Sequence, residues 1–144
     1  MMVIISGTST VIAAALYHQE VVLKGSTNGT ATVTLTTDGS GLSSKAFIPE
    51  LSKSMVCTIA ICASYNGTSS ASWAGNVTLR KGSTHGSLGI SGLQMSETTS
   101  DSSLSSAQIS FDTDLTNGAL IIQCTGVTGI NPLKWVARIS TVEA

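Results

Sequence analysis

The sequence predicts an all-β protein built as an antiparallel β-sandwich, with a jelly-roll-like arrangement of strands. Segments of strand character recur at short intervals, separated by clusters of Gly, Asn, Ser and Asp, and no segment of helical length has an apolar period of about 3.6 residues. Only 10% of the 144 residues are charged, whereas about 25% is usual. A chain of this length forms one domain. We therefore expect residues 1–144 to be a single β-sandwich domain, in which residues 1–25 form an N-terminal arm or an assembly strand.

The first third of the chain contains five expected strands. Residues 2–6 and 11–17 are apolar, although three consecutive alanines make a short helical turn an alternative for 11–17. Residues 20–24 and 45–48 are short strand candidates. Residues 30–36 alternate between small apolar side chains and threonine, which is typical of a strand with one buried face.

Residues 55–64 have two apolar faces. One face carries Met55, Cys57, Ile59, Ile61 and Ala63, and the other carries Val56, Thr58, Ala60 and Cys62. This pattern predicts a strand at the centre of a sheet or one that is covered on both sides. Further strands are expected at residues 73–81, 87–90, 107–113, 119–125 and 133–142.

Turn and loop signals separate these strands. The dipeptide Asn-Gly, which favours tight hairpins, occurs at residues 28–29, 66–67 and 117–118, and the last pair is expected to join the strands at 107–113 and 119–125. Residues 96–106 (SETTSDSSLSS) are polar and low in complexity, which predicts a mobile loop. Binding loops are often of this kind, so Ser96, Asp101 and Ser106 are candidate contact residues.

The three cysteines predict free thiols. Cys57 and Cys62 are expected on opposite faces of one strand and too far apart along it to form a disulfide, so buried free thiols are the expected state of all three, including Cys124. Such thiols suit a protein assembled in a reducing cytoplasm better than a secreted domain held by disulfides. The N-terminus lacks the basic region of a signal peptide, and we expect it to be folded mature protein.

Several function classes are disfavoured by the composition. The net charge is −1 and the basic residues are scattered, so we expect no nucleic-acid partner. No apolar run reaches the roughly 20 residues needed to span a bilayer, so no membrane partner is expected. His85 lies in a glycine-rich turn without a nucleophile motif, and residues 112–118 lack the spacing of a calcium loop. We therefore predict a non-enzymatic protein with no catalytic residue, metal or cofactor.

The C-terminal strand supplies the best candidate contact residues. Trp135, Ala137 and Ile139 share the face that should seal the core, whereas Lys134, Val136 and Arg138 share the other. Arg138 is expected to meet a neighbouring subunit, an acid on the next strand, or solvent, and these alternatives stay open. The low surface charge gives little protection against self-association, so the surface is expected to be covered in part by partners. An ordinary polar β domain fits the composition equally well.

Residues 111–143 (FDTDLTNGALIIQCTGVTGINPLKWVARISTVE) resemble a module of tailed-bacteriophage virion proteins. The shared pattern is a strand ending in Asp-Thr, an Asn-Gly turn, a second strand, a Thr-Gly loop and a final Trp-Val-Ala-Arg strand that closes on Thr-Val-Glu. Residues 73–80 (WAGNVTLR) are similar to the preceding strand of such proteins, so the resemblance covers residues 73–143, about half of the chain. Members of this group are found in tail fibres, tail-associated proteins and head-surface proteins.

The resemblance implies a location on the phage particle surface, for a protein made in the host bacterial cytoplasm. A compact domain without a shaft favours a capsid decoration or cement protein that forms an oligomer, such as a homotrimer, over the joints between major capsid subunits. The alternative is a tail-fibre or receptor-binding protein whose loops, such as residues 96–106, recognise a host surface glycan. The expected partners are other copies of the chain and either the major capsid protein or tail proteins.

Overall fold

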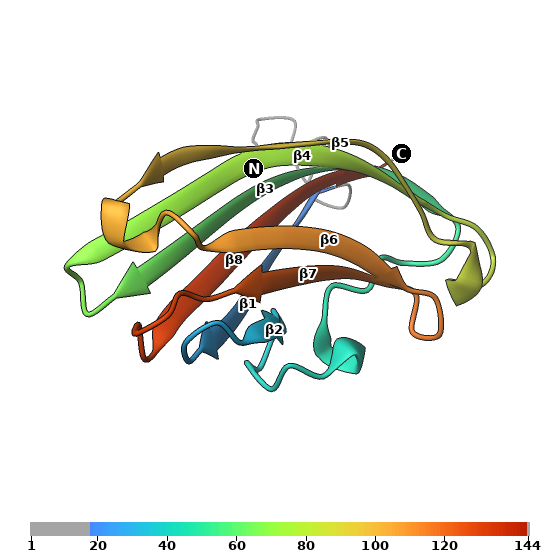
Figure 1. Ribbon diagram of the computed structural model, residues 1–144. Helices are drawn as coiled ribbons and strands as arrows, with labels where there is room; N and C mark the ends of the chain where they lie inside the picture. Colours follow the sequence, from blue (N-terminus) through green and yellow to red (C-terminus); the bar gives the residue numbers. More distant parts are fainter. Residues whose placement is uncertain (1–17, 144) are drawn as a thin grey trace, which may run out of the picture.

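The computed structural model describes residues 18–143 and contains two antiparallel sheets that face each other (Figure 1). The first sheet has five strands in the order β1-β8-β3-β4-β5, and the second has three in the order β2-β7-β6. The predicted all-β sandwich is confirmed. The strands are β1 (His18–Thr27), β2 (Thr32–Thr34), β3 (Lys53–Tyr65), β4 (Ser69–Lys81), β5 (Gly89–Ser100), β6 (Gln108–Asp114), β7 (Ala119–Thr125) and β8 (Leu133–Glu143).

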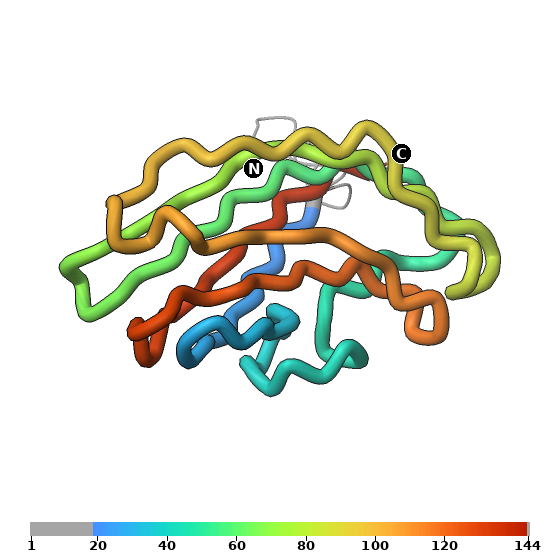
Figure 2. The backbone as a smooth tube through the Cα atoms, in the orientation of Figure 1, coloured from blue at the N-terminus to red at the C-terminus, as the bar shows by residue number. Residues whose placement is uncertain are grey.

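The chain passes repeatedly from one sheet to the other, as expected of a jelly-roll-like fold. It crosses between β1 and β2, between β2 and β3, between β5 and β6, and between β7 and β8 (Figure 2). Three short 3-10 turns lie in the connections: η1 (Ser43–Lys45), η2 (His85–Ser87) and η3 (Ser102–Leu104). Within residues 18–143, no helix is long and apolar enough to cross a membrane.

The core fills the space between the two sheets. Alternation along β3, β4 and β8 directs Ile59, Val77 and Ile139 inward, where they meet Leu120 and Ile122 of β7 in one apolar cluster. The two tryptophans are part of this core, as predicted. Their rings stack with centroids 5.5 Å apart. The indole N–H of Trp135 donates a hydrogen bond of 3.0 Å to the hydroxyl of Thr27, so its polar atom is satisfied in the interior.

Most of the predicted strands are present. The segments predicted at 55–64, 73–81, 107–113, 119–125 and 133–142 correspond to β3, β4, β6, β7 and β8 within a few residues. The prediction at 20–24 falls within β1, so residues 18–25 of the predicted arm belong to the edge strand that pairs with β8. The strands predicted at 2–6 and 11–17, together with the rest of that arm, lie outside the described residues.

Three short strand predictions require correction. The segment 30–36 is a strand only at Thr32–Thr34, although Leu35 is buried as expected. The segment 45–48 makes a single bridge, between Phe47 and Leu120, after the η1 turn. The segment 87–90 is divided between η2 and the start of β5. In each case side chains of the right type are buried, but only part of the predicted segment pairs with another strand.

The prediction of a mobile loop at residues 96–106 is wrong. Its first half is the end of β5, which pairs with β4, and η3 follows from Ser102 to Leu104. β5 is an edge strand without a buried residue, so it lacks the apolar alternation that identifies other strands. Serine and threonine hold it to β4 instead, because Ser72 shares hydrogen bonds of 2.6 and 2.9 Å with Thr98 and Thr99.

Candidate interaction surface

The outer side of the five-stranded sheet carries an uncovered group of small apolar side chains. Alternation along β3 buries Cys57, Ile59 and Ile61 against the core and directs Val56, Ala60 and Cys62 to the outside. Strands β1, β4 and β8 add apolar residues at the same level. We call this group the outer patch; it consists of Val22, Val56, Ala60, Cys62, Ala74, Val136 and Val142.

Strand register brings the members of the outer patch together. Ala60 on β3 lies opposite Ala74 on β4, and Cys62 lies opposite Val136 on β8. At the end of the sheet Val56 lies opposite Val142. Residues directly opposite each other in an antiparallel pair have Cβ atoms about 4.5–5.5 Å apart, so each of these three pairs is in contact range. Thr58 and Ser140 separate Val56 and Val142 from the other members, and Arg138 lies between Val22 and Ala60.

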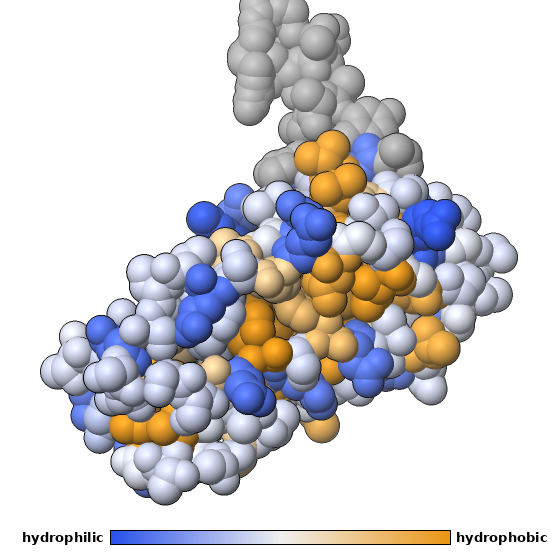
Figure 3. Space-filling view, turned by 45° about the horizontal axis from the view of Figure 1, so that its top comes forward, coloured by the Kyte–Doolittle hydropathy of each residue, from blue (hydrophilic) through white to orange (hydrophobic). Residues whose placement is uncertain are grey.

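No part of residues 18–143 covers the outer patch. The exposed fractions are 64% for Val142, 54% for Val22 and 48% for Val136, which are large values for valine in a sheet. A shallow depression of about 490 Å³ lies over it, bordered by Cys62, Ala74, Val136 and Arg138 among others. Figure 3 looks onto this side of the molecule, where hydrophobic residues gather across the centre between hydrophilic ones.

The charged residues around the outer patch are mainly basic. The same face of the sheet exposes Lys24, Arg80, Lys134 and Arg138, and its acidic residue is Glu20 on β1. The chain has eight Asp and Glu residues, so most acidic side chains lie elsewhere than on this face. The outer face thus combines apolar and basic side chains, and Arg138 lies within the patch between Val22 and Ala60.

The predicted contact residues fall into two groups. Lys134, Val136 and Arg138 lie together on the outer face of β8, and all three are exposed. Ser96 is on the same face at the edge strand, opposite Ala74. Asp101 and Ser106 lie instead where the chain crosses from β5 to β6, and the Asp101 carboxylate accepts a hydrogen bond of 2.7 Å from the Ser70 N–H. Asp101 therefore links the end of β5 to the start of β4.

Arg138 has no acid directly opposite it. Its cross-strand partners are Val22 on β1 and Ala60 on β3, and the acid on the neighbouring strand, Glu20, lies opposite Ser140. The ion pair within residues 18–143 joins Lys53 to Glu143, at 3.7 Å near the end of β8. The guanidinium of Arg138 is left exposed beside the patch, available to solvent or a neighbouring molecule.

The sequence interpretation missed the other members of the patch. These six residues were assigned to strands but not to a site: Val22, Val56, Ala60, Cys62, Ala74 and Val142. The signal for them was present in residues 55–64, where both faces are apolar: β3 is central as predicted, yet residues 18–143 cover only one of its faces.

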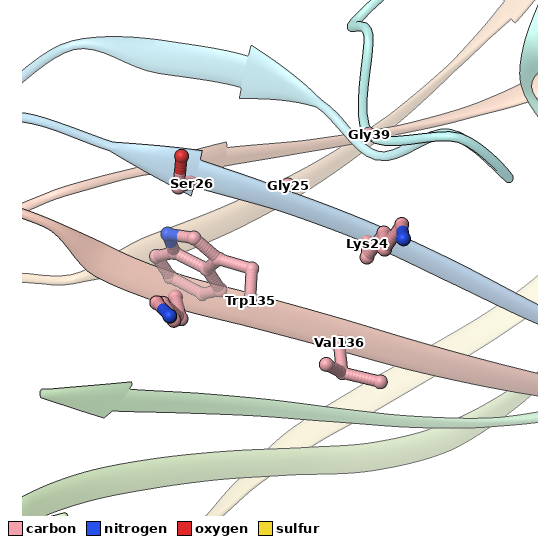
Figure 4. A pocket seen from close by; sticks show the side chains of 7 residues that line it. Lys24, Gly25, Ser26, Gly39, Trp135 and Val136 are labelled. Atoms are coloured by element: carbon pink, nitrogen blue, oxygen red, sulfur yellow. The ribbon is translucent and has the colours of Figure 1, made fainter. Parts of the chain in front are cut away.

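A second depression, of about 300 Å³, lies along β1 and β8. It is bordered by Lys24, Gly25 and Ser26 of β1 and by Trp135 and Val136 of β8 (Figure 4). Trp135 is 1% exposed, so its ring cannot offer the open face on which a sugar would stack. Trp73 is also buried, at 7% exposed.

The cysteines are all free, but they differ in environment. Cys57 and Cys124 are buried, and burial raises the pKa of the Cys57 thiol to about 12 and that of Cys124 further in the same direction. Cys62 is exposed, which corrects the expectation that it is buried. Of the three thiols, only that of Cys62 can be reached by a reagent in solution without unfolding of the described residues.

The candidate chemical groups noted in the sequence lie in η2 and in the β6–β7 hairpin. His85 is exposed in η2, and the segment 112–118 forms the β6–β7 hairpin turn. No group of three or more His, Cys, Asp or Glu side chains within residues 18–143 could hold a metal ion.

Comparison with known proteins gives a weak structural likeness. No family model and no curated protein matches the chain. The crystal structure of the Acinetobacter phage vB_ApiP_P1 tailspike protein matches with a TM-score of 0.38 and 9% identity, over 89% of this chain and 22% of the tailspike chain. The chain thus spans about a fifth of the length of that protein.

Proposed function

We propose that this protein is a structural, non-catalytic component of a tailed-phage particle and assembles through the outer face of its five-stranded sheet. The observation that carries the proposal is the outer patch, where Val22, Val136 and Val142 are each about half exposed or more. Exposed apolar side chains on a chain with only 10% charged residues favour association with other subunits. The resemblance of residues 73–143 to phage virion modules supports a tailed-phage particle as this assembly.

Within the particle, we favour a capsid decoration protein on the head surface. A single compact sandwich can lie over the joints between major capsid subunits and stabilise them, with copies in contact side by side as a homotrimer. Lys134, Val136 and Arg138 then contribute to a subunit contact, because they lie together on the outer face. The partners are other copies of this chain and the major capsid protein.

A tail-fibre or receptor-binding protein is the second candidate. The observation that favours it is β5, an edge strand with many exposed serine and threonine side chains. Hydroxyl groups at an edge can exchange hydrogen bonds with a glycan, and Ser96 and Asp101 lie in or just after this strand. The absence of an exposed tryptophan among residues 18–143 makes this alternative weaker.

Cryo-electron microscopy of the native particle separates the two candidates. Density for this sandwich at every equivalent joint of the capsid lattice is expected for a decoration protein. Density confined to the end of the tail would overturn the head assignment and support receptor binding. Absence of the protein from purified particles, tested by mass spectrometry of the same sample, would overturn both.

A further inference from the structure

We propose that the outer patch binds the N-terminal segment, residues 1–17, of a neighbouring copy of this chain. This inference rests on the proposed function, because it names the partner of the assembly surface. It begins from β3, whose outward residues Val56, Ala60 and Cys62 are as apolar as those of a strand that is covered on both sides. Residues 18–143 do not cover them.

The N-terminal segment has the composition required to cover this surface. Residues 1–5 and 11–17 are entirely apolar, and no charged residue precedes Glu20. Burial of apolar surface contributes roughly 25 cal/mol for each Å², so contact between two such surfaces is favourable. The outer patch offers Val136 and Val142 as matching apolar contacts.

The segment is also long enough. It joins the sheet at His18, which lies opposite Val142 at one end of the outer patch. An extended chain of 17 residues spans at most about 56 Å, whereas the patch crosses three strand spacings, or about 14 Å. Length therefore allows the segment to cross the patch of a second molecule.

The charge of the outer face argues against direct contact between two such faces. The outer face exposes three cations in or beside the patch, Lys24, Lys134 and Arg138. If the outer faces of two copies met directly, these cations of one copy would lie close to those of the other. Like charges held together in an interface are unfavourable. An uncharged segment contacts the same face without that repulsion.

The residues next to His18 argue against folding back onto the same molecule. Residues 11–17 (VIAAALY) include no Gly, Pro, Asn, Asp or Ser, which are the residues that favour tight turns. Extended, these seven residues carry the chain about 23 Å from the sheet before a turn is favoured. A neighbouring molecule is then the more accessible partner.

Disulfide trapping between two different chains tests this arrangement. One chain carries Cys62→Ser together with Ile5→Cys, Ile12→Cys or Leu16→Cys, and the other is the native chain with Cys62. In an equimolar mixture treated with copper phenanthroline, at least one of the three variants is expected to form a disulfide with Cys62 of the native chain. Cys57 and Cys124 do not compete, because they are buried. Tryptic mass spectrometry identifies the joined residues.

The control chain carries Cys62→Ser and Ser44→Cys, in which the new thiol lies in the exposed η1 turn, away from the patch. It should give no disulfide with Cys62. If none of the three segment variants cross-links above this control while light scattering shows an oligomer, segment docking is wrong and assembly through the outer face remains. If the cross-link forms only within a chain that carries both Ile12→Cys and native Cys62, the segment covers its own molecule and the proposal is overturned.

The native thiol provides a second, independent measurement without substitution. Maleimide labelling of Cys62 should slow by at least about tenfold between dilute and concentrated protein, because docking from another copy depends on concentration. Restoration of fast labelling by Ile12→Asp, but not by Ser9→Asp, is expected. Protection that is the same at every concentration, or no protection at all, would contradict docking between copies. A clean monomer that is also absent from particles would overturn the proposed function itself.

Discussion

Lys81 is a buried cation that connects three parts of the sandwich. It is 3% exposed, and its ammonium donates hydrogen bonds to the carbonyl oxygens of Pro49, at 2.7 Å, and Gly118, at 2.9 Å. The end of β4 is thereby tied to the segment before β3 and to the β6–β7 hairpin. Burial lowers the pKa of this lysine, because the charged form loses its contact with water. The two carbonyl groups replace part of that hydration.

Replacing Lys81 with methionine should destabilise the fold. The substitution keeps an unbranched side chain of similar shape but removes the ammonium group, which leaves two carbonyl groups without their donor and is expected to lower the free energy of unfolding by about 1–3 kcal/mol. Urea unfolding followed by tryptophan fluorescence measures the change. Lys53→Met is the matched control: Lys53 forms a partly exposed ion pair with Glu143, and its loss should cost less than about 1 kcal/mol. Equal losses for the two variants would contradict a special role for Lys81.

Asp114 stabilises the turn between β6 and β7. Its carboxylate accepts hydrogen bonds from the backbone N–H groups of Thr116 and Asn117 and, at 2.6 Å, from the Asn117 side-chain amide. Hydrogen bonds from the side chains of Asn117 and Ser43 are the main reason that the pKa of Asp114 falls from 3.8 to about 2. The ionised form is therefore favoured in the folded state.

This shift predicts a specific loss of stability in acid. Because the pKa is lower in the folded than in the unfolded chain, the unfolded chain binds more protons between pH 3.8 and about 2. The stabilisation from Asp114 should be complete above that window and lost as the pH falls through it. Urea midpoints measured across the window should depend less on pH for Asp114→Ala than for the native chain. Equal slopes for the two chains would contradict this role of Asp114.

At the scale of the element, the sequence predicts strands by the face that each one buries. β3, β7 and β8 were predictable because side chains such as Ile59, Ile122 and Ile139 alternate or run together in a way that marks buried strands. β5 was not predictable from its own sequence, since an edge strand that buries nothing has the composition of a loop. Its pairing with β4 is determined by tertiary contact, which a local pattern does not contain.

The candidate site was predictable only in part for the same kind of reason. Arg138 and Val136 could be placed on an outward face from alternation alone. The patch as a whole depends on which strands are neighbours, because Ala60 and Ala74 are opposite each other only once β3 and β4 are paired in register. The apolar outward face of β3 was visible in the sequence, but whether anything covers it was not.

Gly75 is required by the close approach of β4 and β5. A Cβ atom at this position would collide with the carbonyl oxygen of Gln94, and it would also lie 2.7 Å from Cα of Met95. Gly75→Ala should therefore disturb the pairing of the two strands and lower the free energy of unfolding by about 1–3 kcal/mol. Gly89→Ala, in the same strand pair, has its nearest neighbour at 4.0 Å and should change stability by less than about 0.5 kcal/mol. Thermal unfolding of both variants checks the difference.

At the scale of the whole molecule, the outer face of the five-stranded sheet exposes the apolar outer patch together with several basic side chains. Apolar contact and charge attraction respond differently to salt, so salt distinguishes which of them holds copies together. Because the outer patch is apolar, association should persist as sodium chloride is raised and should strengthen in sulfate. Sedimentation velocity at several salt concentrations makes the measurement. Dissociation in high salt would instead indicate contact between the basic outer face and acidic residues elsewhere on the molecule.

A matched pair of substitutions tests whether the outer patch itself is responsible. Val136 and Leu115 are almost equally exposed, at 48% and 50%, but Leu115 lies in the β6–β7 hairpin, away from the outer face. Val136→Ser removes two methyl groups from the patch and should weaken association by roughly tenfold, since about 0.8 kcal/mol is lost for each buried carbon. Leu115→Ser removes a similar apolar area from a surface that the proposal leaves free, so the association constant should be unchanged. Equal effects of the two variants would mean that association follows overall surface polarity, and the outer patch would then have no specific role.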